Sequence, residues 1–194
     1  DLLARHPELL TAMADRQRLA AAREPGELVA SATAIVARHA EAAAAWDALR
    51  RFKRRELVRV AVRDLTGDLP VEQVGAELSA LAEACLEAGL AVAMREAGEA
   101  PPVRVAVLAV GRLGGNELSY TSDLDVLFCH EPAPGADPEA ANRAADRVVR
   151  ELLQGLSAVT PEGTAFKVDP NLRPEGRNGP LSRTLGSYLA YWDR

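Results

Sequence analysis

The sequence predicts an α+β protein in which a helical bundle precedes a small unit of strands and one helix. Apolar residues repeat at helical spacing almost continuously through residues 1–100. A glycine- and proline-rich stretch over residues 98–102 then interrupts this pattern. Beyond it, short runs rich in valine and leucine alternate with turn residues, as strands do. We therefore expect a helical segment over residues 1–100 and a second domain over residues 101–194.

Four helices are expected in the helical segment, over residues 2–22, 27–45, 46–65 and 71–95. The first two are separated by Glu24-Pro25-Gly26, because proline and glycine interrupt helices. The third carries an amphipathic stripe and ends at Gly67, and the fourth begins after Asp68-Leu69-Pro70. Amphipathic helices joined by short breaks predict a bundle.

The second domain is expected to contain three strands and a helix. Residues 103–110 are almost wholly apolar towards their end, which is typical of a central strand, and residues 124–129 form a second apolar run. Asp137 and Pro138 then provide an N-cap and a first-turn proline for a helix over residues 137–155. Residues 164–169 (TAFKVD) are predicted to form the third strand.

Composition and charge exclude several classes of protein. The formal net charge is −5 and the pI is about 5.3, which disfavours extended contact with a nucleic acid backbone. The sequence has neither a stretch of 18 apolar residues nor a signal-peptide pattern, so we expect a cytoplasmic protein without membrane contact. The chain starts inside a helical pattern and stops at Tyr191-Trp192-Asp193-Arg194 without a closing signal. We therefore expect a fragment of a longer protein, cut at both ends, with the second domain truncated at the C-terminus.

The pattern Ser122-Asp123-Leu124-Asp125 places two carboxylates on one face at the start of a strand, because strand side chains alternate between faces. Two like charges this close are unfavourable unless a cation neutralises them, and Mg²⁺ prefers such oxygen ligands. A solvated turn that contains two aspartates is the alternative interpretation.

A glycine-rich loop precedes this pair and strengthens the metal-site interpretation. Gly111, Gly114 and Gly115 follow an apolar strand, where backbone amides can approach a phosphate closely. Arg112 adds a positive charge and Ser122 a hydroxyl group. The loop is neither a Walker loop nor a dinucleotide-binding fingerprint, since the following Lys-Ser/Thr, the third glycine and the opening helix are missing. A glycine-rich turn without a ligand remains the alternative.

A third carboxylate, Asp169, ends the last predicted strand. If that strand lies beside the second one, Asp125 and Asp169 could share a second metal ion in a two-metal centre. Arg173 and Arg177 follow in a loop, where they could contact phosphates held by the carboxylates. The alternatives are a turn aspartate before Pro170 and ordinary loop arginines.

Residues 111–125 (GRLGGNELSYTSDLD) and 168–176 (VDPNLRPEG) closely resemble the glutamine synthetase adenylyltransferase (glutamate-ammonia-ligase adenylyltransferase) family. The resemblance extends over nearly the whole chain, including the basic residues 51–57 and the stretch 188–192. The chain departs from the common pattern in having Arg112 in place of lysine and Thr121 in place of glycine.

The resemblance implies a nucleotidyltransferase fold similar to that of DNA polymerase beta, preceded by a helical segment. It also implies that Asp123, Asp125 and Asp169 hold two Mg²⁺ ions, with ATP as substrate. Residues expected to contact the nucleotide or its phosphates are Gly114, Gly115, Ser122, Arg112 and Arg173.

Members of this family carry two such units in tandem. One transfers AMP from ATP to a tyrosine of glutamine synthetase, which regulates nitrogen assimilation, and the other removes it by phosphorolysis. Residues 111–115, 130–137 and 171–180 resemble the C-terminal, adenylylating unit of actinobacterial members more closely. The alternatives are the adenylyl-removing unit and a catalytically silent nucleotide-binding or docking module. The implied partners are glutamine synthetase and a PII-type signal protein.

Other chemically active side chains are interpreted as structural. Cys85 and Cys129 lie in apolar segments and are expected to be buried free thiols. The histidines (His6, His39 and His130) share no metal-ligand spacing. The basic run Lys53-Arg54-Arg55 could dock a protein partner, but a solvated helix face is the favoured interpretation.

Overall fold

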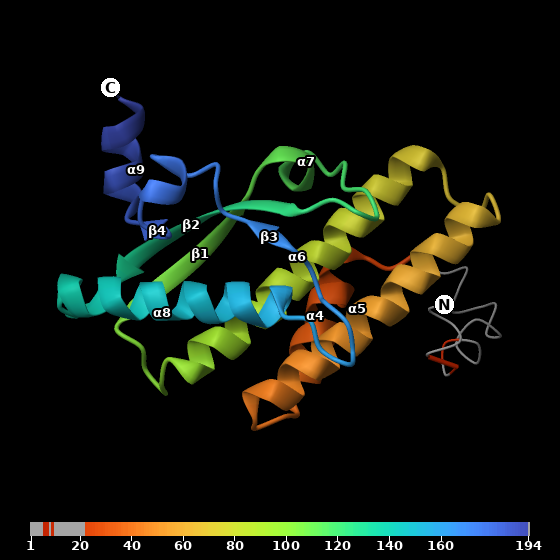
Figure 1. Ribbon diagram of the computed structural model, residues 1–194, viewed down its shortest axis with the longest axis horizontal. Helices are drawn as coiled ribbons and strands as arrows, with labels where there is room; N and C mark the ends of the chain where they lie inside the picture. The colour runs from red at the N-terminus through yellow and green to blue at the C-terminus, as the bar shows by residue number, and fades with distance from the viewer. Residues whose placement is uncertain (1–5, 8, 10–21, 194) are drawn as a thin grey trace.

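The computed structural model describes residues 6, 7, 9 and 22–193 (Figure 1). Helices and a small sheet alternate in it, which confirms the predicted α+β class. The helices are α4 (Pro25–Ala37), α5 (Ala42–Leu65), α6 (Val71–Glu96), α7 (Gly111–Gly114), α8 (Pro138–Ser157) and α9 (Leu185–Trp192), with a 3₁₀ turn over Gly176–Asn178. The strands are β1 (Val103–Ala109), β2 (Leu124–Pro132), β3 (Val168–Asp169) and β4 (Ser182–Arg183). The helix predicted over residues 2–22 lies almost entirely outside the described residues.

The described part of the helical segment contains the last three of the four expected helices, but one break was placed wrongly. α4 ends at Ala37 and α5 begins at Ala42, whereas the sequence predicted a break near residues 45 and 46. Residues 38–41 contain no glycine or proline, so the usual punctuation of a helix end is absent. Pro25, read as a breaker, occupies the first turn of α4, where its missing N–H costs nothing.

The sheet is organised around β2. β1 pairs with β2 antiparallel, and β3 and β4 pair with it in parallel orientation, β3 opposite residues 124–125 and β4 opposite residues 128–129. The prediction that residues 103–110 form a central strand is wrong, because among the described residues β1 pairs only with β2 and exposes alternate side chains. The third predicted strand is also shorter than expected, since only Val168 and Asp169 pair.

A continuous apolar core joins the helices to the sheet. It runs from Leu28 in α4 through α5 and α6 to Leu124, Val126 and Phe128 of β2 and on into α8. α8 contacts all four strands and α6, so it covers one face of the sheet (Figure 1). The opposite face carries Asp125 and the exposed positions of β1. None of the described helices is long and apolar enough to cross a membrane.

Trp46 shows how closely the helical segment and the second unit are joined. Its ring packs beside Gly155 of α8 and Gly89 of α6, and its indole N–H donates a hydrogen bond to Glu151 Oε1 at 3.1 Å. The buried Arg50 of α5 also donates to the carbonyl of Gly155 at 2.6 Å. These contacts connect residues on the two sides of the predicted boundary at residue 100, so the two parts pack directly against each other. The division into two domains at residue 100 therefore stays a prediction.

Candidate active site

The pairing of β2 with β3 brings two of the three predicted aspartates together. Leu124 is the register partner of Val168, and Asp125 is the register partner of Asp169. Register partners in neighbouring strands project from the same face of a sheet, so Asp125 and Asp169 lie together, whereas Asp123 precedes β2. Leu124 is fully buried on the opposite face, so the core orients the Asp125 carboxylate outwards. The expectation that Asp169 lies beside the first pair is confirmed for Asp125 alone.

The glycine-rich loop folds back against the start of β2. The amide of Val110 donates to the carbonyl of Asp125 at 3.0 Å, which joins the end of β1 to the site. Residues 111–114 form one helical turn, α7, which was not expected from the sequence. Gly111 opens this turn at φ +57°, and a Cβ atom there would lie 2.5 Å from Oδ2 of Asp125. The first glycine therefore makes room for the Asp125 carboxylate.

Gly114 is needed for a different reason, because a Cβ atom on it would lie 2.7 Å from the carbonyl oxygen of Ala109. At Gly115 the nearest atom would be 3.5 Å away, which is ordinary contact. The resemblance assigned both glycines to phosphate contact. A side chain would clash with the backbone at Gly114 but not at Gly115. Both are exposed, as is the neighbouring Arg112.

Residues 116–122, which we call the connecting loop, are anchored on the long helices. The amide of Leu118 donates to Ser79 Oγ of α6 at 3.3 Å. The Tyr120 hydroxyl donates to Asp64 of α5 at 2.9 Å. Close contact between Gly75 of α6 and the backbone of Asn116 completes the docking, since a Cβ atom on Gly75 would lie 3.2 Å from the Asn116 oxygen. The helical segment thus supports the loop that leads into Asp123.

Ser122 shapes the end of this loop. Its hydroxyl accepts a hydrogen bond from the Ser119 amide at 3.1 Å and lies 2.7 Å from the Ser119 hydroxyl. Thr121, which replaces the usual glycine, causes no strain, since the non-glycine residues with positive φ in the described chain are Asn116 and Glu175. A phosphate contact by Ser122 stays a prediction.

Asp123 has a partner that the sequence did not indicate. Lys167 Nζ lies 2.6 Å from Oδ2 of Asp123, and the hydrogen bond to this carboxylate, followed by the charges of Asp123 and Asp169, raises the pKa of Lys167. The pair is solvent-accessible, so its contribution to stability is small. The spacing in the sequence could have revealed this ion pair. Lys167 lies two residues before Asp169, and in an extended chain such residues point to the same side.

The loop after β3 fixes Asp169 by local hydrogen bonds. Its Oδ1 accepts from the amide of Asn171 at 2.8 Å. Arg173, predicted to contact the nucleotide, is buried, and it donates to the carbonyls of Pro170 at 2.9 Å and Gly179 at 3.2 Å. In this geometry Arg173 holds the loop together. Its contact with a phosphate stays a prediction, while Arg177 is exposed.

The donor chemistry of the site fits Mg²⁺, although the three carboxylates are not drawn together into one cluster. Asp125 and Asp169 provide hard oxygen ligands on one face of the sheet, and Asp123 adds a third carboxylate immediately before β2. The missing Cβ of Gly111 makes room for the Asp125 carboxylate. Within the described part of the chain, no group of three or more His, Cys, Asp or Glu side chains is arranged as a metal-binding cluster. Asp123 is instead turned to Lys167.

The remaining side chains singled out from the sequence have structural surroundings. Cys85 is a buried free thiol as expected, whereas Cys129 is only half-buried. The interpretation of Lys53-Arg54-Arg55 as a solvated face holds for Arg55 alone, because Arg54 is buried and Lys53 is half-buried. Nε2 of the buried His130 lies 2.7 Å from Asn142 Oδ1.

Comparison with known proteins places this geometry in context. Residues 1–194 match the family model described as glutamate-ammonia ligase adenylyltransferase. The chain is 50% identical over 147 residues to a protein of Streptomyces avermitilis, covering 75% of this chain and 15% of that protein. It is 42% identical over 198 residues to one of Nocardia farcinica and 43% identical over 202 residues to one of Mycobacterium leprae, each time covering 99% of this chain and 20% of the relative. All three relatives are named bifunctional glutamine synthetase adenylyltransferase/adenylyl-removing enzyme. The chain therefore spans a fifth or less of their length.

Proposed function

The chain belongs to the glutamate-ammonia ligase adenylyltransferase family, and on this premise we propose that it carries a nucleotidyltransferase site that transfers AMP from ATP to a tyrosine of glutamine synthetase. We further propose that the part after residue 100 has a polymerase-beta-like nucleotidyltransferase fold. The observation that carries the proposal is the pairing of Asp125 with Asp169 beside the glycine-rich turn.

In the proposed site, Asp123, Asp125 and Asp169 would hold two Mg²⁺ ions. When bound, such ions neutralise the phosphates of ATP and increase the acidity of an attacking hydroxyl group. The Asn171 amide orients Asp169, which supports its proposed role as acceptor of the tyrosine proton. Gly111 keeps open the position of the Asp125 carboxylate.

The proposed reaction is an in-line displacement at the α-phosphorus of ATP. The tyrosine oxygen forms a bond to this phosphorus, the bond to pyrophosphate breaks, and pyrophosphate leaves with the electron pair. Arg112 is exposed beside the glycines, where its charge can stabilise the phosphate oxygens. The connecting loop, anchored on Ser79 and Asp64, would keep the entry to Asp123 in place.

The test uses the double variant Asp123→Asn/Asp125→Asn. The purified chain is incubated with Mg-ATP and unmodified glutamine synthetase, and the AMP added to the tyrosine is measured by mass spectrometry. We expect transfer by the parent chain and its loss in the double variant, with unchanged circular dichroism. Asp146→Asn, at a partly exposed position of α8, is the matched control and should transfer normally. Undiminished transfer by the double variant contradicts the proposal.

The adenylyl-removing direction is the second candidate, because the relatives are named for both activities. It would use the same carboxylates with inorganic phosphate as the nucleophile and would release ADP. Incubation of adenylylated glutamine synthetase with phosphate, followed by measurement of ADP, separates the two directions. Binding of Mg-ATP without turnover in either assay would instead favour a silent nucleotide-binding module.

A further inference from the structure

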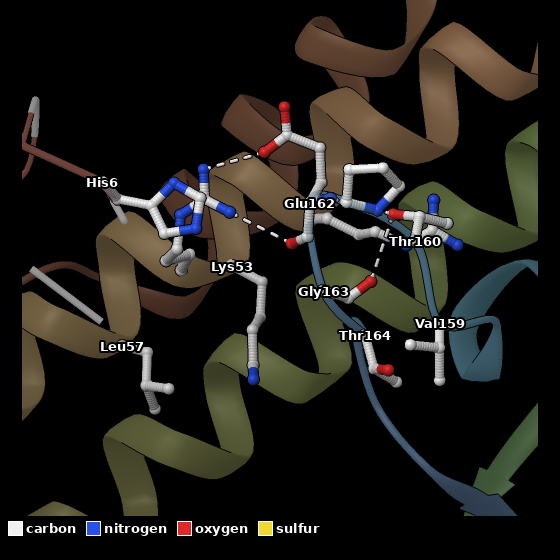
Figure 2. Close-up of a pocket in the computed structure, with 11 residues that line it drawn as sticks. His6, Lys53, Leu57, Val159, Thr160, Glu162, Gly163 and Thr164 are labelled. Carbon is white, nitrogen blue, oxygen red and sulfur yellow. Dashed lines mark hydrogen bonds and ion pairs between the residues drawn. The ribbon is translucent and has the colours of Figure 1, made fainter. Parts of the chain in front are cut away.

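A cavity of about 440 Å³ lies between α5 and residues 159–164, the segment that follows α8 (Figure 2). The α5 wall carries three cationic side chains, Arg50, Lys53 and Arg54, and the opposite wall carries one carboxylate, Glu162. Sites for small molecules have volumes of roughly 300–1,000 Å³. An excess of positive charge in a hollow of this size favours an anionic ligand.

The carboxylate of Glu162 is already engaged by arginines. Its Oε1 lies 3.0 Å from Arg51 Nη1, and its Oε2 lies 2.9 Å from Arg54 Nη2. Arg54 also donates to the backbone carbonyl of Glu162 at 3.0 Å. Both carboxylate oxygens are therefore used to fasten this segment to α5.

Lys53 extends away from Glu162 (Figure 2). Its ammonium lies 5.0 Å from the centre of the Phe166 ring, and it forms no ion pair or hydrogen bond with a described residue. Burial lowers the pKa of this half-buried amine. A partly desolvated cation without an anionic partner is unfavourable, so an anion that entered the cavity would gain a strong, charge-assisted hydrogen bond.

Arg50 is a second cation on the same wall. Its side chain is only 3% exposed, and its terminal nitrogens bond to Asp47 at 3.0 Å and to the Gly155 carbonyl at 2.6 Å. Its Nε is buried from solvent, so it is not accessible as a donor to a ligand. Arg50 therefore contributes positive charge to the cavity wall, and Lys53 provides the available donor.

The cavity continues towards the candidate active site. A second hollow of about 290 Å³ shares Lys53, Leu57 and Thr164 with it and reaches Asp123 and the connecting loop. Lys53 stands where the two hollows meet. A ligand held there would lie beside the aspartate site without occupying it.

We propose that Lys53 is the main binding group for the phosphate or carboxylate group of a small molecule held in these joined cavities. The site is separate from Asp125 and Asp169, and it does not depend on the transfer reaction proposed above. Arg50 contributes positive charge to the cavity wall, and Leu57 and Phe166 provide apolar contact for the rest of the molecule.

The first test is isothermal titration calorimetry of the 194-residue chain with inorganic phosphate and, separately, with succinate. We expect saturable binding of one or both anions by the parent chain. Lys53→Met keeps the apolar stem and removes the charge, so affinity should fall at least about tenfold. Lys53→Arg should retain binding. Arg55→Met, on the exposed side of α5, is the matched control and should leave the affinity unchanged.

Asp125→Asn separates this site from the aspartate site. It should weaken Mg-ATP binding and leave phosphate or succinate binding intact. Anion binding that is lost in Asp125→Asn but kept in Lys53→Met would place the anion at the aspartates and overturn the proposal. Absence of saturable binding by the parent chain for both probes would overturn it as well.

A second readout needs no substitution, because the sequence contains only two lysines, Lys53 and Lys167. Acetylation by a dilute amine-reactive ester, followed by mass spectrometry, reports the reactivity of each. The anion that binds should slow acetylation of Lys53 at least about threefold, as expected at two or more times Kd, whereas sodium chloride at the same ionic strength should not. Unchanged acetylation of Lys53, or equal slowing by chloride, contradicts the proposal.

Discussion

Gly111 lies where the backbone leaves β1, in close contact with the Asp125 carboxylate. The glycine has φ +57°, and a side chain on it would collide with the carboxylate oxygen at 2.5 Å. The requirement for glycine is thus both conformational and steric. Gly111, which lies beside the Asp125 carboxylate, is therefore as tightly constrained as the carboxylate itself.

Replacement of Gly111 by alanine should damage stability and activity together. We expect a loss of about 1–3 kcal/mol in the free energy of unfolding, because alanine is strained at positive φ and its Cβ displaces Asp125. A displaced carboxylate should reduce AMP transfer about 100-fold. Urea unfolding and the mass-spectrometric transfer assay measure the two effects. Gly115→Ala, with its nearest contact at 3.5 Å, is the control and should be nearly neutral in stability.

The connecting loop is the element that links the helices to the site. Tyr120 docks it on α5 through the hydrogen bond to Asp64. Partial burial, together with this hydrogen bond and the charge of Asp64, raises the pKa of Tyr120 to about 12. The hydroxyl group must keep its proton for the contact to persist.

This raised pKa predicts a specific pH dependence. In the unfolded chain Tyr120 loses its proton near pH 10, whereas in the folded chain it keeps it to about pH 12. The contribution of Tyr120 to stability is therefore complete below pH 10 and falls as the pH rises from 10 to 12. Urea unfolding at pH 8 and pH 11 should show a steeper loss for the parent chain than for Tyr120→Phe. Equal losses in both would contradict the docking role of this hydroxyl.

The packing of Trp46 of α5 against α8 is a second element-level constraint. A Cβ atom on Gly155 would lie 2.2 Å from the Trp46 ring, so this ring fills the space that any side chain at position 155 would need. Gly155→Ala should lower the free energy of unfolding by about 1–3 kcal/mol, because the packed ring must move. Trp46→Phe in the same background should recover part of the loss, as a double-mutant cycle in urea would show.

Gly186→Ala provides the comparison for that experiment. Gly186 also lies in a helix, α9, but no atom lies within 4 Å of the position that its Cβ would take. Alanine there should be neutral or stabilise by up to about 1 kcal/mol, because it favours the helix. If Gly186→Ala lowers the free energy of unfolding as much as Gly155→Ala does, contact with the Trp46 ring is not the cause of the loss at Gly155.

At the scale of the whole molecule, the helices and the sheet share one apolar core. Buried Arg50 and Arg54 add hydrogen bonds between α5 and residues 155–162. Neither part can therefore lose its structure without exposing the core of the other.

We expect one cooperative unfolding transition for the described part of the chain. Fluorescence of Trp46, recorded in a Trp192→Phe background, reports on the helices, and far-ultraviolet circular dichroism reports on the whole chain. The two urea midpoints should coincide. Two separated transitions would instead support independent domains divided near residue 100.

The sequence by itself predicted α6 and α8, most of α4 and α5, the α+β class, and the aspartate and glycine-rich motifs, because periodicity and motif spacing are local properties of the chain. Only the tertiary structure decided which strand is central, how Asp125 aligns with Asp169, and why Gly111 must be glycine. It also brought Lys167 to Asp123 and placed Lys53 in a cavity, near the Phe166 ring and without an ion pair to a described residue. These features depend on strand register and on contacts between residues distant in sequence. Such contacts follow from the packing of the whole core, which no local pattern encodes.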